Sequence, residues 1–165
     1  VADGAPESRV IVDANEGWND GNLAGNLAAC AAADVVLVEQ PLPEGRDQAL
    51  AGMTRPIPVC ADESVHDRAS LCALGSKYDA VNIKLDKTGG FSGALAFARA
   101  AQEKNLKIML GCMVGTSLAM APAVLLGSMA DLVDLDGPLL LARDRDHGIA
   151  FSNGVMQPPA PELWG

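Results

Sequence analysis

Three acidic residues and one lysine stand where short apolar runs of the chain end. Asp13, Glu39 and Asp62 each close such a run, and Lys84 closes the run 79–83. Carboxylates that are brought together repel one another unless a cation neutralises them, and their oxygens suit Mg²⁺. A buried lysine beside such a cation has a lowered pKa and could act as a base. These four residues therefore predict a magnesium site next to a base.

Each of these residues has a simpler interpretation when it is taken alone. A single acidic residue after a strand can be a helix N-cap or a solubilising loop residue, and a lysine there can extend to solvent. The simpler interpretation must explain the same placement three times in succession, which favours the metal site. Lys87 is interpreted as a loop lysine, and His66 and His147 as surface residues.

Two further carboxylates, Asp134 and Asp136, alternate along the last apolar run. Alternating residues of a strand point to the same face, so this pair could hold a cationic group of a substrate, such as an α-ammonium. One of the two could instead cap the turn at 137–138.

The apolar runs have the spacing of βα units. They end near residues 13, 39, 62, 84, 111 and 134, at intervals of 26, 23, 22, 27 and 23 residues. A parallel strand, a helix and a return fit each interval, and helical patterns at Leu23–Ala33 and from 92 or 93 to 104 fill two of them. The sequence therefore predicts an α/β fold with a parallel sheet.

The polar residue at each strand end favours a (β/α) barrel over an open doubly wound sheet, because catalytic groups gather at that face of a barrel. Six units are fewer than the eight of a closed barrel, and a complete barrel takes about 250 residues. The chain has 165 residues. We therefore expect one domain over residues 1–165 that forms part of a barrel.

Composition limits the classes of partner. A net charge of −9 and a pI near 4.5 argue against a nucleic acid or an anionic membrane surface. No apolar run has the length of a membrane span, and the first residues lack the pattern of a signal peptide. The four cysteines, which show no CxxC spacing, are predicted to be small buried residues of a cytoplasmic protein: Cys30, Cys60, Cys72 and Cys112.

Taken in order, the strand-end motifs resemble the enolase superfamily, in its muconate-lactonizing subgroup. The motifs are Asp13–Ala14–Asn15, Glu39–Gln40–Pro41, Asp62–Glu63–Ser64 and Asn82–Ile83–Lys84–Leu85–Asp86–Lys87–Thr88–Gly89–Gly90. Gly111–Cys112–Met113 and Asp134–Leu135–Asp136–Gly137–Pro138 narrow the resemblance to the dipeptide epimerases that act on L-Ala-D/L-Glu. The resemblance covers nearly the whole chain, from about residue 9 to residue 165.

The resemblance implies that Asp13, Glu39 and Asp62 bind Mg²⁺, which in turn holds the carboxylate next to the reacting carbon. Lys84 would be one of two lysines that flank this carbon. One lysine removes the α-proton to give an enediolate, and the other returns a proton to the opposite face. The physics agrees, because the α-proton beside a carboxylate is very weakly acidic and needs electrostatic help.

The same resemblance assigns the substrate-binding residues. Asp134 and Asp136 would hold the ammonium group of the dipeptide, and Cys112 and Met113 would line the site beside them. The expected partners are therefore a small dipeptide, and either a second copy of the chain or a complementing N-terminal segment.

The chain departs from the family in one large respect. Members have an N-terminal capping domain and two earlier barrel strands, of which the second carries a Lys-x-Lys motif with the other catalytic lysine, and nothing here matches these parts. We expect the chain to be the C-terminal part of the barrel, about strands 3–8. The 165-residue segment alone is expected to show no epimerisation, because the reaction needs both lysines.

Two alternatives remain open at the level of sequence. A muconate cycloisomerase or an o-succinylbenzoate synthase would share the metal ligands and Lys84, although its substrate has no ammonium group for Asp134 and Asp136. A non-catalytic α/β module that binds a metal would keep the carboxylates without any exchange of a substrate α-proton.

Overall fold

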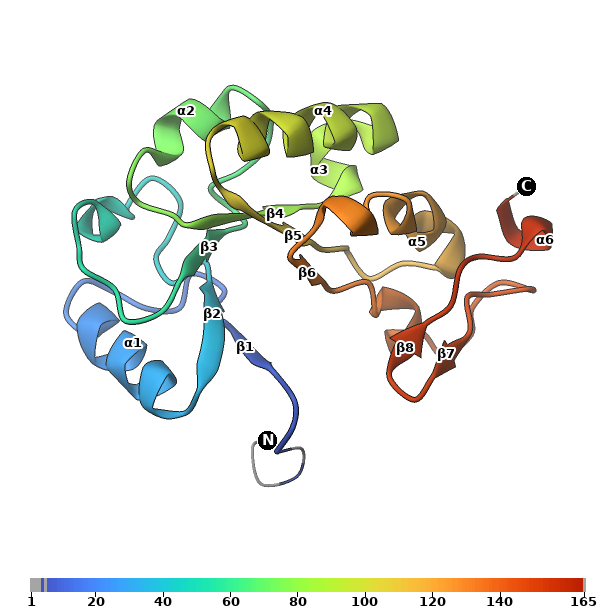
Figure 1. Ribbon diagram of the computed structural model, residues 1–165, viewed down its shortest axis with the longest axis horizontal. Helices are drawn as coiled ribbons and strands as arrows, with labels where there is room; N and C mark the ends of the chain where they lie inside the picture. The colour runs from blue at the N-terminus through green and yellow to red at the C-terminus, as the bar shows by residue number, and fades with distance from the viewer. Residues whose placement is uncertain (1–3, 5, 165) are drawn as a thin grey trace.

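The computed structural model describes residue 4 and residues 6–164. Six parallel strands form one sheet in the order β1-β2-β3-β4-β5-β6, so that every strand pairs with its neighbour in sequence. The strands curve in an arc with the main helices on its outer side (Figure 1). This half-barrel confirms the predicted α/β fold.

The bounds of the elements follow the predicted βα units. The strands of the sheet are β1 (Val10–Asp13), β2 (Val35–Glu39), β3 (Val59–Ala61), β4 (Ala80–Ile83), β5 (Lys107–Leu110) and β6 (Leu132–Val133). The helices that follow them are α1 (Leu23–Ala32), α2 (Ser70–Leu74), α3 (Leu85–Thr88), α4 (Gly90–Glu103) and α5 (Ser117–Val124). Short 3-10 helices are η2 (Gln48–Leu50), η3 (Gly127–Met129) and η4 (Gly137–Leu140). The C-terminal segment adds β7 (Phe151–Ser152), β8 (Val155–Met156) and α6 (Pro161–Trp164).

One local prediction was wrong. The residues after Lys84 form helix α3 rather than a loop, and Gly89 separates it from α4 with a φ of +80°, which a glycine adopts without strain. The C-terminal tail, for which no strand was predicted, contains the hairpin β7–β8, which turns at Asn153 and Gly154, both at positive φ. An Asn-Gly pair is a strong hairpin signal, so the sequence did hold the necessary information.

The sheet is apolar on both faces, as parallel sheets are. Its outer face packs on the helices in a large core that includes Leu27, Leu74, Phe97 and Leu110. Its inner face carries a smaller apolar cluster of Leu37, Cys60, Ala80 and Met109. Within the described residues, no helix is long and apolar enough to cross a membrane.

The cysteines only partly match their prediction. Cys60 is buried, Cys30 and Cys112 are half-buried, and Cys72 is exposed, because it lies on the outward side of the short helix α2. All four are free thiols.

The first and last strands of the sheet are its edges. In the part of the chain that the structure describes, β1 pairs only with β2 and β6 pairs only with β5. Val133 on β6 is 53% exposed, which is unusual for a residue of a parallel sheet. These edges are what a barrel that continues beyond six strands would leave.

A polar cluster lies outside the sheet, beneath the loop that follows β2. Asp47 is 3% exposed and accepts hydrogen bonds from Lys77 Nζ and Tyr78 Oη, both at 2.8 Å. Burial acts to raise the pKa of Asp47, but these hydrogen bonds outweigh it and hold the pKa below its ordinary value. Ionised Asp47 therefore stabilises the fold.

We predict that Asp47 contributes to loss of stability in acid. Because its pKa is lower in the folded state, its contribution is present above about pH 4 and disappears as the pH falls through the lowered pKa. Urea unfolding at a series of pH values should give a flatter curve of unfolding free energy for Asp47→Asn below pH 5. The exposed residue Asp20 provides the control substitution Asp20→Asn, and an identical curve for Asp47→Asn and the unsubstituted protein would contradict the prediction.

Candidate active site

The strand periodicity brings the predicted site residues to one face of the sheet. The inner apolar cluster consists of Leu37, Cys60, Ala80 and Met109, with Ile11 and Leu132 beside it. Residues two positions further along a strand share its face. In strand order these are Asp13, Glu39, Asp62, Asn82, Gly111 and Asp134, and Lys84 lies two beyond Asn82. A polar layer therefore sits on the apolar layer, at the carboxyl ends of the strands.

The strand register sets Asp13, Glu39 and Asp62 side by side. Asp13 is the register partner of Glu39, and Glu39 is the register partner of Cys60, two residues before Asp62. The three carboxylates are close enough that Asp13 and Asp62 both act on the ionisation of Glu39. The predicted grouping of these side chains on one rim is therefore what the fold produces.

Glu39 is the most deeply buried of the three carboxylates, at 3% exposure. Burial, with the added repulsion of Asp13 and Asp62, raises its pKa to about 7. Its Oε1 accepts a hydrogen bond of 2.6 Å from Asn82 Nδ2. The charge of Lys84 acts in the opposite direction but does not offset the effect of burial.

Asp62 is paired with two lysines. Lys84 Nζ lies 2.7 Å from Asp62 Oδ2, and Lys87 Nζ donates to Asp62 Oδ1 and, at 2.6 Å, to its backbone carbonyl. Burial acts to raise the pKa of Asp62, but the two lysines outweigh it and lower the pKa. The interpretation of Lys87 as a loop lysine was wrong, because helix α3 turns its side chain back onto Asp62.

The pKa of Lys84 differs from the expectation of a lowered value. Burial does act to lower it, but the hydrogen bond to Asp62 and the nearby Glu39 and Glu63 outweigh burial and raise the pKa above its ordinary value. A cation that took over Asp62 would weaken this ion pair and add positive charge, which would shift the pKa of Lys84 downward. The direction of its shift thus depends on what neutralises Asp62.

The donor set fits a hard divalent cation. Buried side-chain acceptors that have no hydrogen-bond partner within the described residues are Glu63 Oε2 and Asn82 Oδ1. Asn82 lies in this polar layer, and Glu63 is close enough to act on the ionisation of Lys84. Together with the raised pKa of Glu39 they indicate a surplus of acceptors over cations, and oxygen donors suit Mg²⁺. Within residue 4 and residues 6–164, however, no three acidic, His or Cys side chains already form a metal-binding geometry. The assignment of Asp13, Glu39 and Asp62 as ligands therefore stays a prediction.

Asp134 and Asp136 lie together, as predicted, but not within a strand. Strand β6 ends at Val133, and Asp136 immediately precedes η4. Burial raises the pKa of Asp134, and the carboxylate of Asp136 raises it further. The structure thus gathers an exposed acidic pair whose charges are unfavourable together.

Cys112 and Met113 lie next to the loop that carries this acidic pair. A Cβ added to Gly137 would lie 2.8 Å from the Met113 carbonyl oxygen and 3.2 Å from Cys112 Sγ, so the absence of a side chain at Gly137 permits the approach. Met113 is 51% exposed. Cys112 is more buried, and its burial raises the pKa of the thiol. Their assignment to substrate binding stays a prediction.

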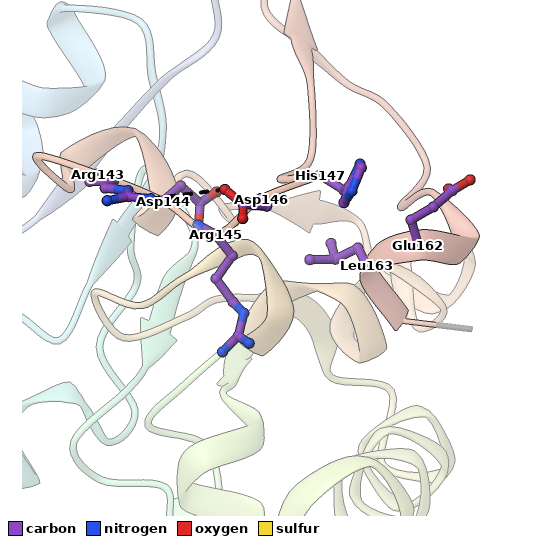
Figure 2. Close-up of a pocket in the computed structure, with 7 residues that line it drawn as sticks. All are labelled: Arg143, Asp144, Arg145, Asp146, His147, Glu162 and Leu163. Atoms are coloured by element: carbon purple, nitrogen blue, oxygen red, sulfur yellow. Dashed lines mark hydrogen bonds and ion pairs between the residues drawn. The ribbon is translucent and has the colours of Figure 1, made fainter.

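Both histidines lie at the surface, which confirms their interpretation. His66 Nε2 lies 2.8 Å from Glu44 Oε1 in an exposed contact, and His147 lines an open pocket of about 400 Å³ near the C-terminus. In Figure 2 the charged side chains around that pocket point in different directions instead of toward a common centre. The predicted site residues do not line it.

Asn82 was missed by sequence reasoning. It is the one polar residue in the strand Ala80–Ile83 and stands two positions before Lys84, so alternation along β4 could have placed it on the face of the site.

The chain matches known proteins along almost its whole length. Residues 1–161 match the family model described as enolase C-terminal domain-like. An N-acetyl-D-glutamate racemase from Pseudoalteromonas sp is 54% identical over 100% of this chain and 52% of its own length. An L-Ala-D/L-Glu epimerase from Escherichia coli (strain K12) is 45% identical over 92% of this chain and 47% of its own length. The chain therefore spans about half the length of these relatives.

Solved structures agree with the same relationship. An enolase family member from Agrobacterium tumefaciens with homology to dipeptide epimerases, which contains bound sodium and L-Ala-L-Glu, superposes with a TM-score of 0.97 at 52% identity. The match covers 100% of this chain and 51% of that one. A dipeptide epimerase from Methylococcus capsulatus, complexed with a Mg ion, gives a TM-score of 0.83 at 29% identity over 93% and 47% of the two chains. These findings confirm the resemblance stated from the sequence.

We predict that the fold requires glycine at position 111, because the Asn82 side chain occupies the space that a Cβ at position 111 would need. A Cβ on Gly111 would overlap the Asn82 amide, only 2.7 Å from its Nδ2, and would push it away from Glu39. Gly111→Ala should therefore cost about 1–3 kcal/mol of unfolding free energy in the full-length protein. The same change should cost clearly less in an Asn82→Ala background, where the clash is absent. Equal costs in the two backgrounds would contradict this account.

Proposed function

Since the chain belongs to the enolase C-terminal domain-like family, we propose that the full-length protein is a Mg²⁺-dependent epimerase. Its substrate would be a dipeptide of the L-Ala-D/L-Glu type, inverted at the α-carbon of the second residue. The observation that carries the proposal is the row of Asp13, Glu39 and Asp62 on one rim of the sheet, with Lys84 against Asp62.

The row of carboxylates supplies the place for the cation. Asp13, Glu39 and Asp62 would hold Mg²⁺, which neutralises the charge that develops on the substrate carboxylate when the α-proton leaves. Asn82 fixes one oxygen of Glu39 and so orients the central carboxylate of the row. Because Glu39 is buried, its charge acts through a medium that screens it weakly.

Lys84 is the residue that would move a proton at the α-carbon. It follows a buried strand and faces the carboxylates, so its Nζ is held at the edge of the row. Lys87 would stay paired with Asp62 when Lys84 turns toward a substrate, so one ammonium group would remain beside this carboxylate. The proton on the opposite face would come from a second lysine in the part of the protein outside this chain.

Asp134 and Asp136 support a substrate with a positive charge. Asp136 raises the pKa of Asp134, so the two neighbouring carboxylates become more favourable when a cation lies between them. The α-ammonium of an alanyl residue is such a cation, whereas an acetyl group, or the substrate of a cycloisomerase, offers none. This pair therefore favours the dipeptide over the alternatives considered from the sequence.

The partners and the location of the protein belong to the same proposal. The edges at β1 and β6 suit a complementing N-terminal segment that closes the barrel, and a homo-oligomer is the alternative. The acidic net charge gives no support to a nucleic-acid or membrane partner. A cytoplasmic location rests on four cysteines that are all free thiols.

We predict that the acidic pair separates dipeptide from N-acetylated substrates. In D₂O the full-length protein with Mg²⁺ should exchange the α-proton of the glutamate residue in L-Ala-L-Glu. The double variant Asp134→Asn/Asp136→Asn should raise KM for this dipeptide by about tenfold or more, since a charge-assisted contact contributes about 1.5–3 kcal/mol. KM for N-acetyl-glutamate, if it is turned over, should not rise.

The matched control removes two carboxylates elsewhere on the same segment. Asp146→Asn/Glu162→Gln alters the pocket of Figure 2 and should leave KM for L-Ala-L-Glu unchanged. An unchanged KM in the Asp134/Asp136 variant would remove the support for an ammonium-bearing substrate. Absence of exchange by the unsubstituted full-length protein would overturn the proposed function.

A further inference from the structure

We propose that Gln40 is the positioning residue that fixes Asp62 relative to Glu39, and so sets the spacing of the carboxylates for their cation. The inference rests on the proposed function, because it concerns the same row of carboxylates. Gln40 follows Glu39 directly, and alternation along the chain sends the two side chains to opposite sides. Its side chain bonds to Leu42, Asp62, Ser64 and Tyr78 and to none of the carboxylate groups, so it can act only through these neighbours.

The side chain of Gln40 is fully buried and uses both ends of its amide. Oε1 accepts hydrogen bonds from the backbone N–H groups of Asp62 at 2.9 Å and Ser64 at 3.1 Å. Nε2 donates to the Leu42 carbonyl at 2.8 Å, to Ser64 Oγ at 2.9 Å and to Tyr78 Oη at 3.0 Å. A carboxamide is the side chain that can accept on one side and donate on the other in this way.

The backbone of Gln40 forms hydrogen bonds to strand β3 and to the loop that follows β1. Its N–H donates to the Cys60 carbonyl at 2.9 Å, and its carbonyl accepts from the N–H of Glu16 at 2.8 Å. Glu16 belongs to the loop that follows Asp13. The segments after β1, β2 and β3, which carry the three carboxylates, therefore meet at one residue.

The backbone conformation of Gln40 is strained. Its φ is +30°, which a residue with a side chain rarely adopts and which costs of order 1–3 kcal/mol. Such strain persists when the surroundings over-determine the conformation, and here the hydrogen bonds of the amide supply that constraint. Asn15 and Glu16, in the loop after Asp13, are also at positive φ. The loops after Asp13 and Glu39 thus both contain residues at positive φ.

Removal of Oε1 would release the loop that carries Asp62. The N–H groups of Asp62 and Ser64 would lose their acceptor, and a buried donor without a partner drives the backbone to move. Asp62 also binds Lys84 and Lys87, so a shift of its backbone would displace both lysines from the row. Residues that orient metal ligands in this manner typically change metal affinity by about 10–100-fold when they are substituted.

The test compares Gln40→Met with Tyr78→Phe in the full-length protein. Both substitutions remove buried hydrogen bonds of the same cluster, and both should lower the unfolding free energy in urea. Only Gln40→Met removes the acceptor for Asp62 N–H, so it should weaken Mg²⁺ binding in calorimetry by about 10–100-fold. Gln40→Glu restores an acceptor at Oε1 and should recover part of that affinity. In D₂O exchange at saturating Mg²⁺, Gln40→Met should lower kcat more than it changes KM for the dipeptide.

Two outcomes would overturn the inference. Mg²⁺ affinity in Gln40→Met that equals that of the unsubstituted protein would show that Gln40 does not position Asp62 for the cation. An equal loss in Gln40→Met and Tyr78→Phe would show that affinity follows stability and not the contact with Asp62. Failure of the unsubstituted protein to bind Mg²⁺ is a distinct result, which would overturn the proposed function and this inference with it.

Discussion

The rest of the structure depends on the repulsion among carboxylates that share one rim of a parallel sheet. Asp13, Glu39 and Asp62 are held in neighbouring register, and burial raises the pKa of Glu39 to about 7. The chain meets this cost locally with an amide from Asn82 and with ammonium groups from Lys84 and Lys87. A site that needs positive charge to be stable is one that binds a cation well.

The fold supplies this constraint through its two simplest periodicities. Alternation along each strand separates an inner apolar layer from the polar layer above it, while the recurring βα unit brings all carboxyl ends to the same side. Helices cover the outer face and contribute Leu27, Leu74 and Phe97 to the core (Figure 1). The polar layer thus rests on the inner apolar layer, and the helices support the sheet from its outer side. Gln40 connects the segments that follow β1, β2 and β3 by hydrogen bonds.

Sequence reasoning could find what depends on local pattern. The strand ends and the order of the carboxylates follow from spacing and alternation, and Asp134 and Asp136 lie together as predicted although they follow the strand. It could not find Lys87 on Asp62, because that contact requires helix α3 to turn a residue back across the strand end. It could not find the ion pair of Lys84 with Asp62, which outweighs burial and raises the pKa of Lys84 while no cation neutralises Asp62. Gln40 reads as an ordinary loop residue until its five side-chain contacts are seen in three dimensions.

The most direct test of the account is a calorimetric titration of the full-length protein with Mg²⁺, beside the variant Glu39→Gln. Glutamine preserves the shape of Glu39 and removes the charge that Asp13 and Asp62 cannot replace. The account predicts one site per chain in the unsubstituted protein and a loss of affinity of about 100-fold or more in the variant, beyond the usual effect of residues outside the ligand set. Equal affinity in the two proteins would contradict it, because the buried centre of the row would then have no part in holding the cation.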